Sequence, residues 1–485
     1  MKKSKIISLI LIFLVVAAGA FFGVQFFTST GIFKKPGVIT YSESLTDEEI
    51  AFLKEIFAED VVLDKDVTIS AETSLTAQTG DNLLLYEIYV PVMDFYTAKS
   101  DLSASEVTDD ILIPVSELNS KVKLMSIDGE YYLDTFSSGA HFRYLIFEGE
   151  NISESMDLVS PQLAQTYPTK DTVLTFAQTG VTALSRDMIT KLNSTGGDGA
   201  YFAANIKDFL SSFDLTHTSN ESSFIASAYA PGTVSSRTTI CSDERMIDTL
   251  TAIGLDIVEL TGNHNRDCGD DPANETIDTY NELGIKIVGG GKTAAEAAEP
   301  LQISEKGTNI TMLAYNQSTG GATYDDTPGA NQYYEEDAAS NIAAAKARGD
   351  FVIVDVQYYE CNLYGNVTED TYCDYADSAA GDQIGFFRHL IDLGADIVVG
   401  TSAHQTQTYE RYNGGVIYYG LGNLFFDQVW WPGTTRSLVL GHYFYNGTLL
   451  QTRLYGTIYG DEMQPELLDE ETLTWFIDRL NQARP

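Results

Sequence analysis

The feature of this sequence that most constrains its fold is the stretch from Ile257 to Gly269, which reads IVELTGNHNRDCG. Its apolar start predicts a buried strand, and Gly262 lets the backbone turn where a larger side chain would clash. Polar side chains then follow closely, at Asn263, His264, Asn265 and Asp267. A polar turn at the carboxyl end of a strand is where α/β proteins usually place their chemistry. The stretch therefore predicts an α/β domain with a functional site at this turn.

From about residue 170 onward, apolar strand patterns alternate with helical patterns. Strands are predicted at residues 173–177, 213–218, 256–260, 285–288, 310–315, 351–356, 397–399 and 416–419. Helices are predicted at residues 199–212, 246–253, 276–283 and 384–393. Such alternation is typical of an α/β layered domain.

The chain has 485 residues, enough for two or three domains. Thr46 and Glu49 form a capping-box pattern, and several short strand patterns follow it, so residues 38–165 predict a smaller N-terminal α/β module. The expected parts are a cytoplasmic tip with a transmembrane segment at 1–30, the module with its linker at 31–165, the main domain at 166–430, and a β-rich C-terminal extension packed on it at 431–485.

Residues 6–27 carry no charge and follow three lysines, Lys2, Lys3 and Lys5. A run of ~20 apolar residues can span a bilayer. Small residues at 17–20 could end a cleaved signal peptide, but phenylalanines continue the apolar run beyond them, which favours an uncleaved signal-anchor. The flanking lysines favour an N-terminus inside the cell. We therefore expect a single-pass protein of the cell membrane with its bulk extracytoplasmic.

The formal net charge is -40, from 69 acidic and 29 basic residues. This balance argues against binding to nucleic acid, which requires a basic surface. A polyanionic ligand would need metal ions or a locally basic pocket.

Four cysteines, Cys241, Cys268, Cys361 and Cys373, lie in one region of the chain. Outside the cell they could form disulfides, and four cysteines allow three pairings among which the sequence does not choose. Their spacing does not match a zinc site.

Polar clusters follow six of the predicted strands, at residues 178–182, 219–221, 262–264, 357–360, 400–404 and 420–423. In an α/β sheet such clusters converge at one edge. Oxygen and imidazole ligands suit hard divalent cations, and a two-metal site can bind phosphate and activate water. His264, if it is not a ligand, could protonate a leaving group.

Residues 172–428 resemble the CapA family, which is linked to bacterial poly-γ-glutamate capsule synthesis. The segments that carry the resemblance are TGVTALSR, SNE, GNHNRDCG, QYYE, GTSAH and YGLGNLFFD, in the same order and with similar separations as in that family. The resemblance implies a calcineurin-like metallophosphatase-type fold, a layered β-sandwich flanked by helices. It does not extend to residues 1–165.

Several positions depart from the family pattern. Thr179 stands where the family has its first Asp, Gln357 replaces a His, and Thr401 and Ser402 replace two more. Thr and Gln are weak metal ligands. The replacements indicate a subfamily with altered chemistry at this site.

The resemblance implies a role for each retained or replaced polar residue. The residues expected to be catalytic are His264, Asp267 and Glu360. The residues expected to hold a divalent metal (Mn, Fe or Zn), if one is bound, are Glu221, Asn263 and His404. Substrate contacts are expected from Thr179, Thr182, Arg186, Asn220, Gln357 and Asn423. A structural role is the alternative for some polar residues. Asn423 would then hold a turn, and His217 and His389 would stabilise the fold.

Three functional hypotheses follow. The first is a membrane-anchored CapA-like protein that acts in the synthesis or export of a capsular polymer, within a membrane polymer-synthesis complex. The second is a metal-dependent phosphoesterase-like hydrolase of cell-envelope substrates. The third is a non-catalytic scaffold that binds an anionic polymer. The replaced ligands weigh against the second hypothesis, and the retained Asn-His turn weighs against the third.

Overall fold

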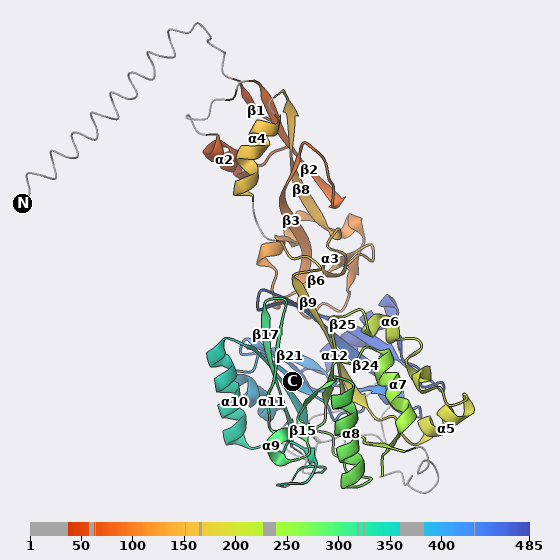
Figure 1. Cartoon of the computed structure of the whole chain (residues 1–485). Helices are drawn as coiled ribbons and strands as arrows, with labels where there is room; N and C mark the ends of the chain where they lie inside the picture. The colour runs from red at the N-terminus through yellow and green to blue at the C-terminus, as the bar shows by residue number, and fades with distance from the viewer. Residues whose placement is uncertain are drawn as a thin grey trace, which may run out of the picture. The chain divides into compact units, whose positions relative to one another are not determined.

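The computed structural model describes residues 37–57, 63, 65–150, 152–163, 167–226, 239–317, 320–323, 325–358, 383–430 and 432–485 (Figure 1). The chain divides into two compact units. One comprises Met1–Tyr89 with His141–Thr166, and the other comprises Val90–Ala140 with Tyr167–Pro485. The expected signal-anchor at residues 6–27 lies outside the described residues, and within the described part of the chain no helix is long and apolar enough to cross a membrane.

The first unit packs two helices against strands around its own core. Its elements are β1 (Ile39–Tyr41), α2 (Asp47–Ile56), β2 (Val67–Thr76), α4 (Ile152–Val159) and the adjoining parts of β3 (Leu83–Asp94) and β8 (Ser138–Gly149). The predicted capping box is confirmed, because Thr46 Oγ1 accepts from Glu49 N at 3.1 Å and Glu49 Oε2 accepts from Thr46 N at 2.7 Å. Burial would raise the pKa of Glu49, but its hydrogen bonds to Arg143 and Thr46 outweigh burial and lower it.

The second unit is built on two sheets that pack face to face. The first has the order β14-β13-β10-β9-β24-β25-β26, with β23 also beside β9, and the second has the order β16-β17-β19-β20-β22-β21. The bounds in the first sheet are β9 Val173–Thr182, β10 Leu215–Asn220, β13 Ile257–Glu259, β14 Lys286–Val288, β23 Asn423–Phe425, β24 Arg436–Tyr445, β25 Thr448–Ile458 and β26 Glu466–Leu467. Those in the second are β16 Leu301–Glu305, β17 Thr308–Asn316, β19 Phe351–Gln357, β20 Ile397–Gly400, β21 Tyr409–Tyr412 and β22 Gly415–Tyr418.

The central strands of each sheet run parallel, so their carboxyl ends lie at one edge. In the first sheet, β9, β10, β13 and β14 are parallel neighbours. In the second sheet, β17, β19, β20 and β22 are parallel neighbours. Strand β24, from the C-terminal part of the chain, lies antiparallel to β9 with Val439 opposite Thr179. The predicted α/β layered architecture is therefore confirmed.

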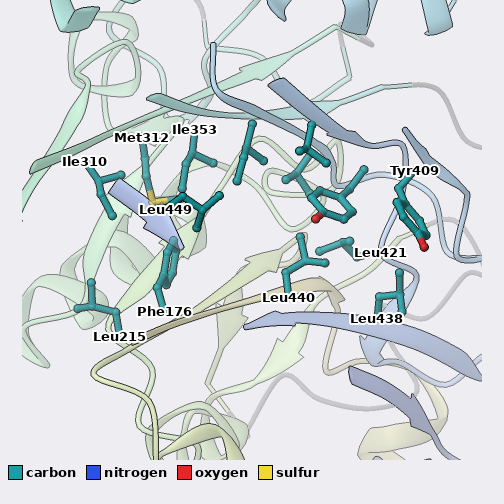
Figure 2. Packing of buried hydrophobic residues seen from close by; sticks show 14 of the residues in the cluster. Phe176, Leu215, Ile310, Met312, Ile353, Tyr409, Leu421, Leu438, Leu440 and Leu449 are labelled. Carbon is teal, nitrogen blue, oxygen red and sulfur yellow. The ribbon is translucent and has the colours of Figure 1, made fainter. Parts of the chain in front are cut away.

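Apolar side chains from the two sheets fill the space between them (Figure 2). Phe176 of β9 and Leu440 of β24 face Met312 of β17 and Ile353 of β19, and all four are fully buried. Because side chains alternate along a strand, every second residue of each strand points into this layer.

Helices cover the outer faces of the two sheets. On the first sheet, the helical segments contribute Met188, Leu250 and Tyr280 to a core that includes Val258 of β13. On the second sheet, Ile342 and Phe387 contribute to a core with the outward valines of β19. The bounds of these helices are α5 Asp187–Ser194, α7 Ile247–Ala252, α8 Asp270–Glu282, α10 Glu335–Arg348 and α11 Gln383–Asp392. The last helix, α12 (Glu470–Gln482), instead contributes Phe476 and Leu480 to the core between the sheets.

One predicted helix is wrong. Residues 199–212 were expected to form a single helix, but the structure has a 3₁₀ turn at Gly199–Ala203 and a short helix α6 at Lys207–Leu210. A Cβ at position 199 would lie 1.8 Å from Arg245 O, so this segment packs directly against a neighbouring backbone. Tertiary packing overrides local helical preference here.

We expect Phe176→Ala to lower the free energy of unfolding of the second unit by about 3 to 5 kcal/mol, because it opens a cavity in the layer between the sheets. All three tryptophans of the chain lie after residue 429, within this unit, so urea unfolding followed by tryptophan fluorescence reports on it. Leu283→Ala, at a side chain that is 48 % exposed, is the control and should change stability by less than about 0.5 kcal/mol. Equal effects of the two changes would contradict this view of the core.

Candidate functional site

The polar elements that follow the strands meet at one edge of the second unit, as predicted. The first two are joined where Glu221 N donates to Thr182 O at 2.9 Å. Glu221 also packs under the Asn-His turn, because a Cβ at Gly262 would lie 2.7 Å from Glu221 Cα. The contact leaves no room for any side chain at position 262, which explains the glycine in GNH.

Hydrogen bonds link the remaining elements into a closed ring of contacts. Gln357 Nε2 donates to Asn263 Oδ1 at 2.9 Å and lies 3.2 Å from Ser402 Oγ, so it joins the ends of β13, β19 and β20. His404 Nδ1 lies 2.8 Å from Asn423 Oδ1, and Asn423 pairs with Val181 of β9, where the ring begins. We call these six connected elements the strand-end ring.

His264 and Asp267 form a close pair on the strand-end ring. His264 Nδ1 lies 2.7 Å from Asp267 Oδ2, and the two side chains are 17 % and 20 % exposed. The same carboxylate oxygen accepts from Ile240 N at 2.8 Å. Cys241 forms a disulfide with Cys268, the residue after Asp267. This is one of the three pairings that the sequence left open; the other two cysteines lie outside the described residues.

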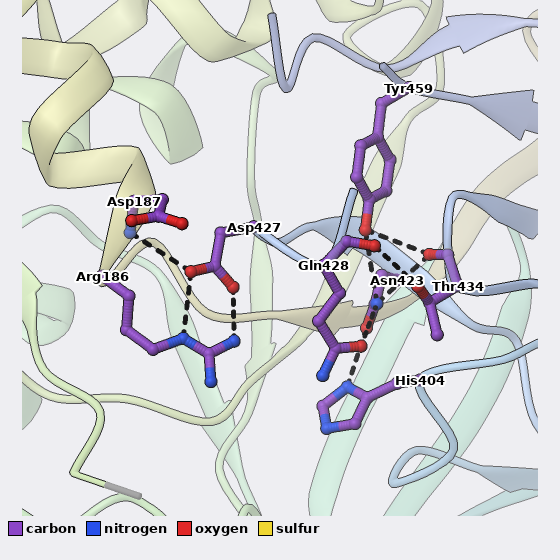
Figure 3. Close-up of polar contacts among 8 residues, drawn as sticks. All are labelled: Arg186, Asp187, His404, Asn423, Asp427, Gln428, Thr434 and Tyr459. Atoms are coloured by element: carbon purple, nitrogen blue, oxygen red, sulfur yellow. Dashed lines mark hydrogen bonds and ion pairs between the residues drawn. The ribbon is translucent and has the colours of Figure 1, made fainter. Parts of the chain in front are cut away.

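Arg186 is held in an unusual backbone conformation beside the ring, with a φ of 52°. Its guanidinium forms a two-pronged ion pair with Asp427, with Nε 3.0 Å from Oδ2 (Figure 3). It also lies 4.7 Å from the ring centroid of Phe426, which stacks on His404 at 4.7 Å. Positive φ at a non-glycine residue costs free energy and clusters at functional sites. The ion pair with Asp427, whose Oδ2 also accepts from Asp187 N at the start of α5 at 3.2 Å, maintains the strained position.

Four of the residues expected to contact substrate are fully buried and have partners inside the protein. The partners are His217 O for Thr179, Thr218 for Thr182, Ser222 O and Tyr280 for Asn220, and His404, Gln428, Thr434 O and Tyr459 for Asn423 (Figure 3). Their geometry explains how the ring is held together. Contact with a substrate stays a prediction for these four and for Arg186 and Gln357.

The described residues do not fit a metal centre of the expected kind. Across the described ranges, no three His, Cys, Asp or Glu residues are grouped so that they could hold a metal ion. Of the expected ligands, Asn263 accepts from Gln357, His404 contacts Asn423 through Nδ1, and Glu221 packs beneath Gly262. Neutral amides are poor substitutes for carboxylates as ligands. Glu360, expected to be catalytic, lies outside the described residues.

A buried layer of polar residues lies directly beneath the strand-end ring, and the sequence reasoning missed it. Gln178 Nε2 donates to Asp355 Oδ1 across the two sheets at 2.6 Å, and His217 Nε2 lies 3.2 Å from Asp355 Oδ2. His442 Nε2 lies 3.2 Å from Gln178 Oε1. Glu259 Oε1 accepts at 2.7 Å from Thr261 N, which lies just after the end of β13. We call Gln178, His217, Glu259, Asp355 and His442 the inter-sheet polar layer; all five are fully buried.

The alternation of side chains along the strands could have revealed this layer. Ile353, Asp355 and Gln357 occupy successive inward positions of β19, so the face changes from apolar to acidic to amide toward the ring. Polar residues at alternating positions of an otherwise apolar strand are the signal. The motifs of the sequence draw attention to the strand ends instead, and His217 was expected to be structural.

Burial controls protonation within the inter-sheet polar layer. Burial, with Asp355 nearby, raises the pKa of Glu259 from 4.5 to about 8. Burial, with His217 nearby, lowers the pKa of His442 to about 3, so the His442 imidazole is neutral near pH 7. Two other buried carboxylates pair with arginine, Asp427 with Arg186 and Asp243 with Arg245, and Asp355 contacts Gln178 and His217. Glu259 therefore keeps its proton near neutral pH, because a buried charge is costly without such a partner.

The fold and the site together define a class: an α/β sandwich with a polar strand-end site that carries a His-Asp pair and an Arg-Asp pair. Residues 175–428, more than half of the chain, match the model of the family described as bacterial capsule synthesis protein PGA_cap. The chain belongs to this family. All six elements of the strand-end ring fall within the matched residues.

Relatives in this family cover the same part of the chain. The capsule biosynthesis protein CapA of Bacillus anthracis is 24% identical over 217 residues, which are 44% of this chain and 50% of that protein. The PGA biosynthesis protein CapA of Bacillus subtilis is 29% identical over 210 residues, 43% of this chain and 52% of that protein. A probable polyglutamine synthesis accessory protein of Mycobacterium tuberculosis is 28% identical over 194 residues, 37% of this chain and 48% of that protein. The chain thus spans about half the length of the curated relatives it matches.

Solved structures with some likeness include the Haemophilus influenzae NAD nucleotidase NadN, at 11% identity and a TM-score of 0.33, covering 64% of this chain and 56% of that chain. The Thermus thermophilus sulfate thiohydrolase SoxB, at 10% identity, also has a TM-score of 0.33, covering 66% of this chain and 61% of that chain. Likeness at this level is too low to support an inference about function.

We expect the stability of the protein to fall as pH rises from about 4.5 to about 8, partly because of Glu259. Over this range the unfolded chain releases the Glu259 proton while the folded chain keeps it, so unfolding becomes more favourable. Glu259→Gln, which mimics the protonated acid, should flatten this part of the profile measured by urea unfolding at each pH. Glu282→Gln, at an exposed position of α8, is the control and should leave the profile unchanged. Parallel profiles for wild type and Glu259→Gln would disprove the assignment.

Proposed function

We propose that this protein acts at the outer face of the bacterial membrane in the synthesis or export of a capsular polymer of the poly-γ-glutamate type. The observation that carries the proposal is the strand-end ring, which brings six separated segments of the matched region to one edge of the sandwich. Family membership supports the polymer class, and the printed names of two relatives refer to capsule and PGA biosynthesis. We include in this proposal that the fold is of the metallophosphatase type.

The chemistry of the ring suits an anionic polymer. Its replaced positions, Thr179, Gln357 and Ser402, carry no charge, so they add no repulsion toward carboxylates in a chain with a net charge of -40. The carboxylate of Asp427 is balanced by Arg186. For the amides and hydroxyls of the ring to hydrogen-bond such a polymer, they would have to exchange their present partners, such as Asn263 and Ser402 for Gln357.

The His264–Asp267 pair supplies the reactive group in this proposal. His264 Nδ1 lies 2.7 Å from Asp267 Oδ2, and a histidine paired with a carboxylate in this way can exchange a proton with a bound group. Arrangements of this kind act in general acid-base catalysis. The pair would move a proton at the polymer or at its carrier.

The disulfide between Cys241 and Cys268 supports an extracytoplasmic location, because disulfides persist in oxidising compartments. The apolar run at residues 6–27 is the proposed anchor, and a membrane polymer-synthesis complex is the proposed setting. Both are consistent with a polymer that is made or exported at the membrane.

Complementation of a gene deletion tests the proposal. Wild type should restore the polymer, whereas His264→Ala and Asp267→Asn should reduce it at least about tenfold, because the proton-transfer group is lost. His389→Ala, which removes a 43 % exposed histidine that pairs with Glu335, is the matched control and should restore the polymer fully. Polymer that is unaffected by the deletion would refute the function. Full rescue by His264→Ala would instead favour a scaffold that binds the polymer.

A metal-dependent hydrolase is the second candidate, and the His264–Asp267 pair is the observation that favours it. Metal analysis of the purified full-length protein separates the two. We expect no stoichiometric Mn, Fe or Zn, because the described ring carries too few anionic or imidazole donors. One metal ion per chain that is lost in His404→Ala, together with hydrolysis of a generic phosphoester such as p-nitrophenyl phosphate, would support the hydrolase instead.

A further inference from the structure

The segment around Cys241 bridges two elements of the strand-end ring. On one side, Cys241 is bonded to Cys268, and Ile240 N donates to Asp267 Oδ2 at 2.8 Å. On the other side, Ser242 N donates to Ser223 O at 2.9 Å. The segment thus connects the loop that carries the His-Asp pair with the chain that follows Glu221.

The Ser242 side of this bridge is rigidly held. Strand β12 (Ser242–Asp243) pairs with β11 (Phe224–Ile225), and Ser242 Oγ lies 2.7 Å from Ser222 Oγ. Ser242 and Asp243 are fully buried, and Asp243 forms an ion pair with Arg245 at 2.7 Å. The position of Ile240 is therefore set by buried structure two residues away.

The loop itself is fixed at both ends, and within it Asp267 N donates to His264 O at 3.1 Å. Asn265 Nδ2 donates to Leu260 O at 2.6 Å, which holds the start of the loop, and α8 begins at Asp270, which pairs with Arg266. Between these points, Asp267 is tied to the rest of the protein by the Ile240 amide and by the disulfide of its neighbour.

The position of Asp267 affects the tautomer and the orientation of His264. In a neutral imidazole only one nitrogen carries the proton, and the group that accepts from one nitrogen decides which. A carboxylate held at Nδ1 fixes the proton there and orients the ring. If Asp267 moves, the contact at Nδ1 that favours this tautomer and this ring orientation is lost.

We propose that the Cys241–Cys268 disulfide is a positioning element for the site: it keeps the Ile240 amide on Asp267, and through Asp267 it fixes the tautomer and orientation of His264. Its relevance to polymer chemistry rests on the proposed function, but the positioning itself does not. The disulfide also restricts the unfolded chain, since it joins residues separated by 27 positions. A purely stabilising disulfide would leave the imidazole unchanged in the folded protein.

Selective ¹⁵N labelling of histidine in the full-length protein, purified in detergent, distinguishes the two roles. The chain has six histidines, so the long-range proton–nitrogen spectrum can be assigned by substitution. We expect wild-type His264 to give the signature of a single tautomer protonated at Nδ1. The double variant Cys241→Ser with Cys268→Ser should shift the two nitrogen resonances toward those of a mixed, solution-like imidazole. Asp267→Asn provides the reference for a lost carboxylate, and the His389 resonances serve as the internal control.

Reduction of the wild-type protein provides a second measurement that does not depend on folding of the variant. A dithiol reduces the bond by exchange, leaving two protein thiols and one oxidised reagent molecule. Below the unfolding temperature, hydrogen exchange at the Ile240 amide should then accelerate about tenfold or more, as expected when a hydrogen bond is lost. Exchange in β24 should not change.

An unchanged His264 spectrum and unchanged Ile240 exchange, with the disulfide absent and the fold retained, would overturn the positioning role. The measurements need no substrate, so they can be separated from the proposed function. If they succeed while His264→Ala still supports polymer formation, the positioning stands and the proposed chemistry fails.

Discussion

The packing of two sheets against each other is the constraint on which the rest of this structure depends. Phe176, Leu440, Met312 and Ile353 fill the space between the sheets, and they bring the carboxyl ends of two sets of parallel strands to one edge. Segments that are far apart in the sequence can then touch. The strand-end ring exists because this apolar layer sets the spacing between the sheets.

The composition of the layer changes toward the site. Along β19 it passes from Ile353 through Asp355 to Gln357, and the hydrogen bond between Gln178 and Asp355 ties the two sheets together just below the ring. A buried hydrogen bond of this kind contributes little net stability. Any other register of the sheets would leave its polar groups buried and unpaired, which costs free energy. The apolar part of the layer supplies most of the stability, and the polar part favours one alignment of the strand ends.

Much of the second unit could be predicted from the sequence, because strand and helix patterns have distinct periods and parallel strands end together. The convergence of the polar elements followed from that rule. What the sequence could not supply is the direction of each side chain at a strand end. The pairing of β9 with β10 shifts register between His217 and Ser219, and Thr179 at this irregularity donates to His217 O. An irregularity of one residue reverses which side chains face inward, and it leaves no local signal.

The two cysteines of the site were visible in the sequence, but their pairing was not, because three pairings were equally open. The inter-sheet polar layer was missed for a different reason. Asp355 and Glu259 lie inside apolar strands, where single polar residues have little weight in a pattern, and only the opposing sheet shows that they meet in one layer.

The pairing of β24 with β9 has a consequence for how the protein matures. Val173 lies opposite Tyr445, and the ring closes only where Asn423 meets Val181, more than 240 positions along the chain. Contacts of such long range form slowly, after much of the chain is available. The strand-end ring therefore cannot close until the last quarter of the chain has been synthesised, whereas the first unit needs no residue beyond Thr166.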